Sequence, residues 1–106
     1  MFVAMFRFRV RRGDETAFEA HWLSRESYLP EVPGFVAFNI LKGPQAEDHT
    51  LYVSHSVWDS EAAYGAWTHS EAFRLAHRDA ERNLPLILGP PALELFEVLK
   101  TVTPAK

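Results

Sequence analysis

Alternating apolar and polar positions mark the first segment of the chain. In residues 2–11 every second residue is apolar, and the positions between them include three arginines. Alternation of this kind predicts a β-strand with one face toward the core. The expected inward set is Phe2, Ala4, Phe6, Phe8 and Val10, and the opposite set is Val3, Met5, Arg7 and Arg9. Comparable patterns predict further strands at 35–42, 50–58 and 92–101.

The stretches between these strands carry helical periodicity. A helix is expected over 15–29 because apolar residues recur there every three or four positions. After the third strand, Asp59 or Ser60 can cap a short helix, and Ser70 can cap a second helix that runs to about residue 82. One face of that second helix is shared by Phe73, Ala76, His77 and Ala80. A histidine on an otherwise apolar helix face is the feature that a function has to explain.

The order of elements is therefore β-α-β-β-α-β, the split βαβ or ferredoxin-like arrangement of the α+β class. It predicts a four-stranded antiparallel sheet with the helices on one face. The chain of 106 residues is expected to contain a single domain, residues 1–102, followed by a frayed tail, residues 103–106. Residues 83–91 contain three prolines and a glycine, so they are expected to form a loop.

The sheet face opposite the helices is also expected to be apolar. The second strand is apolar on both sides, and Val3 and Met5 add to the same outer face. Monomers rarely expose an apolar patch of more than about several hundred Å². We therefore expect a two-fold homodimer packed sheet against sheet, a dimeric α/β barrel. The alternative is a monomer in which the loop 83–91 covers this face.

Composition and charge exclude several classes of function. The chain has no cysteine, which excludes disulfides, iron–sulfur clusters and thiolate metal sites and suits a cytoplasmic location. No apolar run is long enough to span a membrane, so no membrane association is expected. The net charge is −3, which argues against nucleic-acid binding. Arg7 and Arg9 would lie on the outer sheet face, with Glu94 or Glu97 as the expected partners.

A set of spaced motifs resembles a known superfamily. The motifs are Pro33-Gly34-Phe35, then Val57-Trp58, then Ser60-Glu61-x-x-Tyr64-x-x-Trp67-x-x-Ser70-x-x-Phe73-x-x-x-His77. Over nearly the whole chain this pattern resembles the antibiotic biosynthesis monooxygenase superfamily. Within it, the placement of Trp67 and His77 is most similar to the small dimeric bacterial heme-degrading monooxygenases.

The resemblance implies roles for four residues. His77 matches the histidine that ligates the heme iron, so it is the expected metal ligand. Trp67 matches the tryptophan that presses on the porphyrin, and Trp67 and His77 are the expected catalytic residues. Phe6 and Phe73 complete the expected cofactor contacts, around a porphyrin or another small aromatic ligand. The family's asparagine on the first strand is replaced by Phe6, or by Arg7 if the register slips by one, so bound dioxygen would lose that hydrogen bond.

Each of these residues also has a purely structural interpretation. A helix histidine can bond to backbone or lie half in solvent, and large aromatic residues such as Trp67 and Phe6 usually anchor a core. Trp22 and Trp58 are expected to be core residues. Among the other histidines, His55 alternates with apolar residues and is the one further candidate for a role.

Three hypotheses about function follow. The leading one is a dimeric monooxygenase that binds, and degrades, heme in a pocket between sheet and helices. The second is a cofactor-free oxygenase of polycyclic phenols or quinols, with His77 or His55 as a base. The third is a non-catalytic dimeric module that binds a small ligand.

Overall fold

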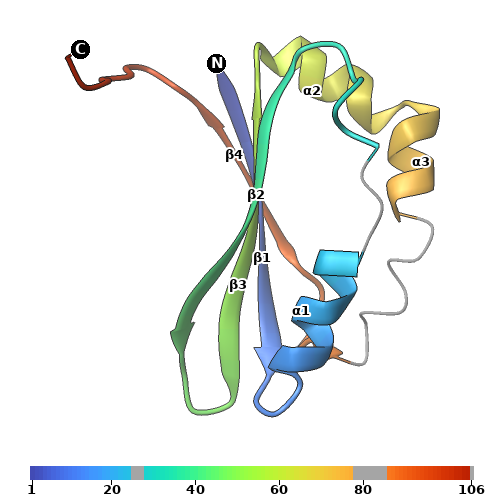
Figure 1. The fold of residues 1–106 in the computed structure, drawn as a ribbon, viewed down its shortest axis with the longest axis vertical. Coiled ribbons are helices and arrows are strands. Elements are labelled where there is room, and N and C mark those ends of the chain that lie inside the picture. Colours follow the sequence, from blue (N-terminus) through green and yellow to red (C-terminus); the bar gives the residue numbers. More distant parts are fainter. Residues whose placement is uncertain (25–27, 78–85, 106) are drawn as a thin grey trace.

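The computed structural model contains a four-stranded antiparallel sheet with helices packed on it (Figure 1). It describes residues 1–24, 28–77 and 86–105, and at 76 and 77 it describes the backbone alone. The elements within these ranges are β1 (Phe2–Arg11), α1 (Glu15–Ser24), β2 (Phe35–Gln45), β3 (His49–Trp58), α2 (Glu61–Thr68), α3 (Glu71–His77) and β4 (Ala92–Glu97). The strand order is β2-β3-β1-β4, which confirms the ferredoxin-like fold.

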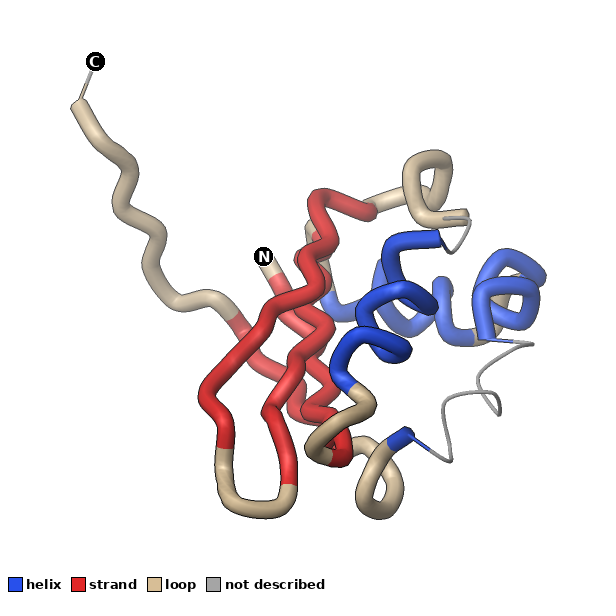
Figure 2. Tube along the Cα trace, turned by 60° about the horizontal axis from the view of Figure 1, so that its bottom comes forward, coloured by secondary structure: helices blue, strands red, loops and turns tan. Residues whose placement is uncertain are grey.

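The helices cover one face of the sheet, as Figure 2 shows. The alternation in β1 decides which residues face them, and Phe2, Ala4, Phe8 and Val10 are all buried, as predicted. Antiparallel pairing places Ala4 opposite Ser56 and Phe8 opposite Tyr52 in β3. Residues directly opposite each other share a face, so β3 adds its even-numbered residues to the same core.

The described core divides into two aromatic clusters on this one face. The first lies under α1 and contains Phe8, Val10, Phe18, Tyr52 and Ile87. The second lies under α2 and α3 and contains Phe2, Trp58 and Trp67. Trp22 and Phe6 pack against the first cluster, and Phe73 packs against the second. Trp58, which is fully buried, is a core residue as predicted, and Trp22 is half-buried at the edge of the core.

The first helix is shorter than predicted. α1 is described to Ser24, and residues 28 and 29 are not helical, although a helix to 29 was expected. Pro30 disfavours a helical conformation at the residue before it. Leu29 instead accepts a hydrogen bond from the Val32 amide (2.9 Å) and packs against the second cluster. The predicted extension of the last helix to residue 82 lies outside the described residues.

The last strand is also shorter than the predicted 92–101. Its final pair is Glu97 with Phe2, and the Val98 amide then donates to the carbonyl of Met1 (2.8 Å). The strand ends here because β1, its partner, begins at Phe2. By contrast, β2 continues to Gln45, past the predicted end at 42, because β3 continues beside it to His49.

The described part of the 83–91 loop packs on the helix-covered face. Ile87 bridges to Val10 and is 4% exposed in the first cluster. The Leu88 amide donates to the Arg9 carbonyl (2.8 Å). The monomer in which this loop covers the opposite face is therefore wrong for residues 86–91, and residues 83–85 lie outside the described part.

The face of the sheet away from the helices, here called the back face, has no layer on it in either view (Figures 1 and 2). Arg7 lies on this face and pairs with Glu94 at 3.7 Å, one of the partners predicted for it. Arg9 instead donates to the Leu88 carbonyl (2.6 Å). Within the described ranges, none of the helices has the length and apolar character needed to cross a membrane.

Candidate functional site

Trp67 is anchored in the second cluster by rings on two sides. Ser60 caps α2 by accepting a hydrogen bond from the Ala63 amide (3.1 Å), which starts the helix that carries Trp67. The Trp67 indole is 6% exposed and stacks on Trp58, with ring centroids 5.9 Å apart and an interplanar angle of 29°. Trp67 is therefore a core residue, as its structural interpretation predicted, and its indole stacks on Trp58.

Ser70 couples α3 to the end of α2. Its hydroxyl donates to the Trp67 carbonyl (2.7 Å) and accepts from the Phe73 amide (3.1 Å). This N-cap, predicted from the sequence, begins α3 immediately after α2. As a result, the Phe73 ring meets the Trp67 indole edge to face, with centroids 5.3 Å apart and an angle of 82°. Two of the predicted site residues are thus in contact.

His77 is the last residue of α3, and its side chain lies outside the described part of the structure. Its position is four residues after Phe73, which is one helical turn. Helical periodicity places positions 73 and 77 on the same side of α3.

Phe6 belongs to the other aromatic cluster. It faces the helices as predicted and lies 6.3 Å from Phe8, ring centroid to ring centroid. On the central strands β1 and β3, the positions between the two clusters carry small side chains, namely Ala4, Ser54 and Ser56. The Ser56 hydroxyl accepts from the Trp58 indole nitrogen (3.0 Å) and donates to the Ala4 carbonyl (3.1 Å). On this face the two central strands therefore have large rings at both ends and small residues in the middle.

His55 lies on the back face. It sits between Met5 of β1 and Asn39 of β2 in the strand register. This is the side of the sheet away from Trp67 and Phe73. The expectation that His55 could serve as a base beside those residues is therefore wrong, because odd-numbered positions of β3 face away from the helices.

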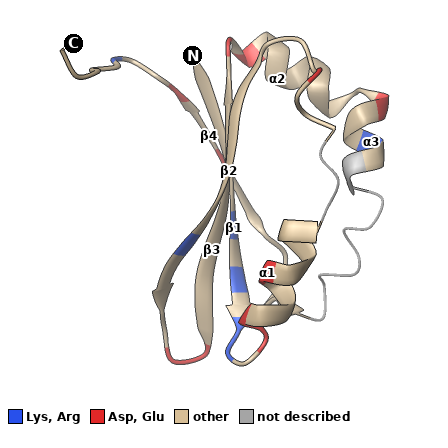
Figure 3. Ribbon diagram, viewed as in Figure 1, with Lys and Arg blue, Asp and Glu red and all other residues tan. Residues whose placement is uncertain are grey.

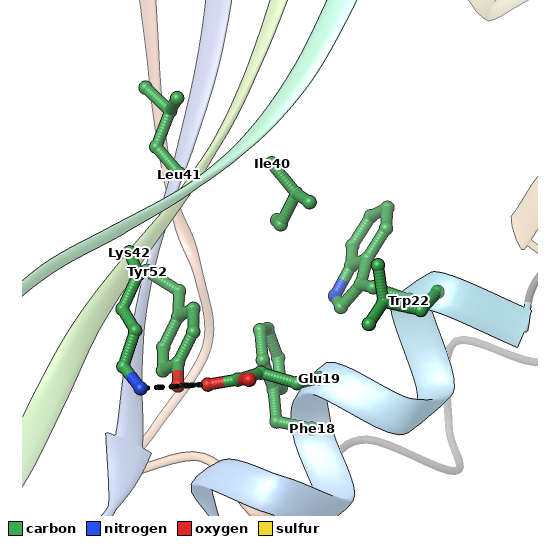
Figure 4. Close-up of a pocket in the computed structure, with 8 residues that line it drawn as sticks. Phe18, Glu19, Trp22, Ile40, Leu41, Lys42 and Tyr52 are labelled. Atoms are coloured by element: carbon green, nitrogen blue, oxygen red, sulfur yellow. Dashed lines mark hydrogen bonds and ion pairs between the residues drawn. The ribbon is translucent and has the colours of Figure 1, made fainter.

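A cleft of about 190 Å³ opens between α1 and the β2–β3 hairpin (Figure 4). Aromatic and aliphatic side chains form most of its lining, and Glu19 and Lys42 lie at one end: its lining residues are Phe18, Glu19, Trp22, Leu23, Ile40, Leu41, Lys42 and Tyr52. Figure 3 shows that charged residues also gather at this end of the molecule, around the β1–α1 turn and the hairpin.

Glu19 joins Lys42 and Tyr52 at this cleft. The Tyr52 hydroxyl donates to Glu19 Oε2, and Lys42 Nζ lies 2.9 Å from the same oxygen. Burial and the Glu19 carboxylate raise the pKa of Tyr52 to about 12. The hydrogen bonds from Tyr52 and Lys42 lower the pKa of Glu19. Sequence reasoning missed this group, because its members come from a helix and two strands whose register only the fold defines.

Comparison with known proteins identifies the family. The model of the family described as "Antibiotic biosynthesis monooxygenase" matches residues 1–79. A mycobilin-producing heme oxygenase of Mycobacterium tuberculosis is 30% identical over 93 residues, which cover 88% of this chain and 84% of that protein.

Solved structures agree with the family match. The heme-degrader MhuD of M. tuberculosis, with two hemes bound in its active site, superposes with a TM-score of 0.73 at 27% identity and covers 97% of this chain and 100% of its own. SnoaB of Streptomyces nogalater, a cofactor-independent oxygenase, gives a TM-score of 0.68 at 25% identity, covering 95% of each chain. The chain therefore belongs to the antibiotic biosynthesis monooxygenase family.

Proposed function

We propose that this protein binds heme, with His77 as the protein ligand to the iron, and that it degrades the bound heme. The 30% identical relative is a heme oxygenase, and the matched MhuD structure holds hemes. The observation that carries the proposal is the packing of Phe73 on Trp67. It fixes the side of α3 that faces the core, and position 77 falls on that same side one turn later.

The residues on the helix-covered face fit a flat apolar ligand. Ala4, Ser54 and Ser56 are small side chains in the middle of the two central strands, and Trp67 and Phe6 belong to the aromatic clusters on either side of them. An imidazole is a common axial ligand of heme iron, and one such ligand is sufficient.

The side chains would position the macrocycle and keep water away from it. Trp58 and Phe73 both contact the Trp67 ring, so the indole would keep its position when a ligand binds. Phe6 would close the other end of the site with an apolar surface. Bound heme would supply the chemistry of dioxygen activation, and the chain would control access and the shape of the ring.

Hemin titration of the apoprotein tests this proposal. We expect a Soret band to appear with saturable binding, and His77→Ala to weaken binding at least about tenfold, or about 1.4 kcal/mol. His49→Ala is the matched control, because His49 pairs with Asp48 (2.7 Å) at the hairpin, far along the chain from α3. Equal spectra and affinities for wild type and His77→Ala would refute the role of His77.

A second candidate function is cofactor-free oxygenation of a polycyclic phenol or quinol. It is favoured by β1, whose helix-facing side chains are all apolar: Phe2, Ala4, Phe6, Phe8 and Val10. None of these helix-facing side chains could donate a hydrogen bond to a ligand bound under the helices. SnoaB, matched in fold at 25% identity, is a cofactor-independent oxygenase. Oxygen uptake with an anthrone-type substrate in metal-free buffer would support this candidate, and dependence on hemin would refute it.

The protein would act as a homodimer packed through its back faces. Val3, Met5 and Val57 are half-buried there, and Leu41 and Phe96 are 44% and 46% exposed. Arg7 and Glu94 neutralise each other on the same face. Val57→Arg would place a charge on this surface, and we expect it to convert the dimer to a monomer in sedimentation analysis.

A further inference from the structure

The cleft between α1 and the β2–β3 hairpin is separate from the residues to which heme binding is assigned above. Its volume is about 190 Å³, and neither Trp67 nor Phe73 nor Phe6 lines it. Sites for drug-sized ligands usually measure about 300–1,000 Å³. The cleft is therefore too small for a porphyrin and matches a ligand of one or two rings.

Trp22 forms a fixed aromatic wall of this cleft. Its ring stacks on Phe38 of β2, with centroids 5.8 Å apart and an interplanar angle of 23°. A second ring, that of Phe8, meets it edge to face at 6.0 Å. Figure 4 shows Trp22 and Ile40 at one end of the cleft, with Tyr52 and Glu19 toward the other. A flat ring placed between these residues would find an aromatic surface already in position.

The apolar lining continues to the surface of the molecule. Leu23 of α1 and Leu41 of β2 both line the cleft, and they are 79% and 44% exposed. A large apolar side chain gains free energy when another apolar surface covers it. An apolar ligand in the cleft would cover part of this exposed surface.

The other end of the cleft is polar and has no net charge. Glu19 Oε2 accepts a hydrogen bond from the Tyr52 hydroxyl and lies 2.9 Å from Lys42 Nζ. The carboxylate and the ammonium neutralise each other, which favours an uncharged ligand over an ion. A carboxylate offers about four acceptor positions and an ammonium three N–H donors. The pair therefore retains both an acceptor and donors for a ligand.

We propose that this cleft is a second binding site, for an uncharged hydroxylated aromatic molecule of one or two rings. The ring would lie against Trp22 and Ile40, and the hydroxyl would donate to Glu19 and accept from Lys42. A hydroxyl is the smallest group that satisfies both partners at once. The inference goes beyond heme binding and does not depend on it, because no residue assigned to heme lines the cleft.

Titration of the ¹⁵N-labelled protein with 2-naphthol tests where such a ligand binds. The chain has three tryptophans, of which Trp22 lines the cleft, while Trp58 and Trp67 belong to the second cluster. Trp22→Phe identifies the Trp22 indole signal. We expect 2-naphthol to shift that signal with saturation. A larger shift at Trp67 than at Trp22, or no saturable shift at Trp22, would overturn the proposal.

The hydroxyl is tested with a ligand that lacks the donor. 2-Methoxynaphthalene keeps the rings and the oxygen but cannot donate to Glu19. Because hydrogen bonds to charged groups are among the strongest, we expect it to bind at least about tenfold more weakly than 2-naphthol. Equal affinities would overturn the proposal, and this comparison needs no altered protein.

A charge-removing variant tests the role of Glu19. Glu19→Gln is expected to weaken 2-naphthol binding at least about threefold, because an amide oxygen is a weaker acceptor than a carboxylate. Glu47→Gln is the matched control, since it removes the same charge from an exposed residue of the nearby hairpin that does not line the cleft. Equal affinities of the two variants for 2-naphthol would overturn the assignment of the hydroxyl to Glu19 and with it the proposal.

Discussion

Trp67 and Phe73 meet edge to face, with ring centroids 5.3 Å apart and an angle of 82° between the rings. They come from different helices, and Ser70 bonds to the backbone of both residues. This contact fixes α3, and with it position 77, relative to the indole of α2. The candidate site therefore depends on a short segment in which the cap and the ring contact act together.

Phe73→Ala should loosen α3 and weaken ligand binding. The side chain is half-buried, so we expect a loss of about 2 kcal/mol in the free energy of unfolding, below the range for a fully buried phenylalanine. Urea unfolding measures this loss. Phe73→Leu keeps most of the apolar volume and should lose about 1 kcal/mol, chiefly the ring contact. Equal stability of Phe73→Ala and wild type would show that the contact does not hold α3.

Two glycines should respond to alanine in opposite directions. Gly34 has a φ of +81°, and a Cβ there would collide with the Cβ of Ala63 in α2. Gly34→Ala should therefore destabilise the protein by at least about 1–2 kcal/mol. Gly65 lies within α2 with open space around it, so Gly65→Ala should stabilise by about 0.5–1 kcal/mol. Thermal unfolding of both variants tests this prediction. Melting-temperature shifts of the same sign would contradict the packing described here.

The Glu19 carboxylate should make stability depend on acid pH. Hydrogen bonds from Tyr52 and Lys42 lower its pKa in the folded state. A lowered pKa means that its contribution is present above the ordinary carboxyl value and is lost as the pH falls through the folded value. Between about pH 7 and about pH 3, the urea midpoint of Glu19→Gln should therefore fall less than that of wild type. Parallel pH profiles would refute this.

Tyr52 should be the last phenol to ionise. Its pKa is raised to about 12, so its contribution to stability is present below the ordinary tyrosine value and is lost as the pH rises through about 12. Absorbance at alkaline pH measures tyrosine ionisation, and Tyr52→Phe should remove the final step of the titration. If that step survives in Tyr52→Phe, the hydrogen bond to Glu19 does not control it.

Local sequence patterns predicted the parts of this fold that local physics decides. The alternation in β1 placed Phe2, Phe8 and Val10 in the core, because side chains of a strand point to opposite faces in turn. Ser60 and Ser70 were predicted as helix caps, and both accept the expected backbone hydrogen bonds. These features depend on spacing along the chain, which the sequence contains.

Features that depend on contacts between segments distant in the sequence could not be predicted from local patterns. β4 ends at Glu97 because β1 begins at Phe2, and nothing in the composition of residues 98–101 indicates this. The Glu19–Tyr52 pair joins α1 to β3, and its members lie 33 residues apart. His55 was expected as a possible base in the pocket but lies on the back face, because a strand pattern does not say which face the helices will cover. The role of His77 stays a prediction.

Chemical rescue of position 77 tests the central claim most directly. His77→Gly removes the imidazole, and free imidazole added to the hemin complex can then take its place on the iron. If His77 ligates heme, the Soret band of His77→Gly differs from that of wild type, and added imidazole restores the wild-type spectrum. A wild-type Soret band in His77→Gly before imidazole is added would contradict the claim.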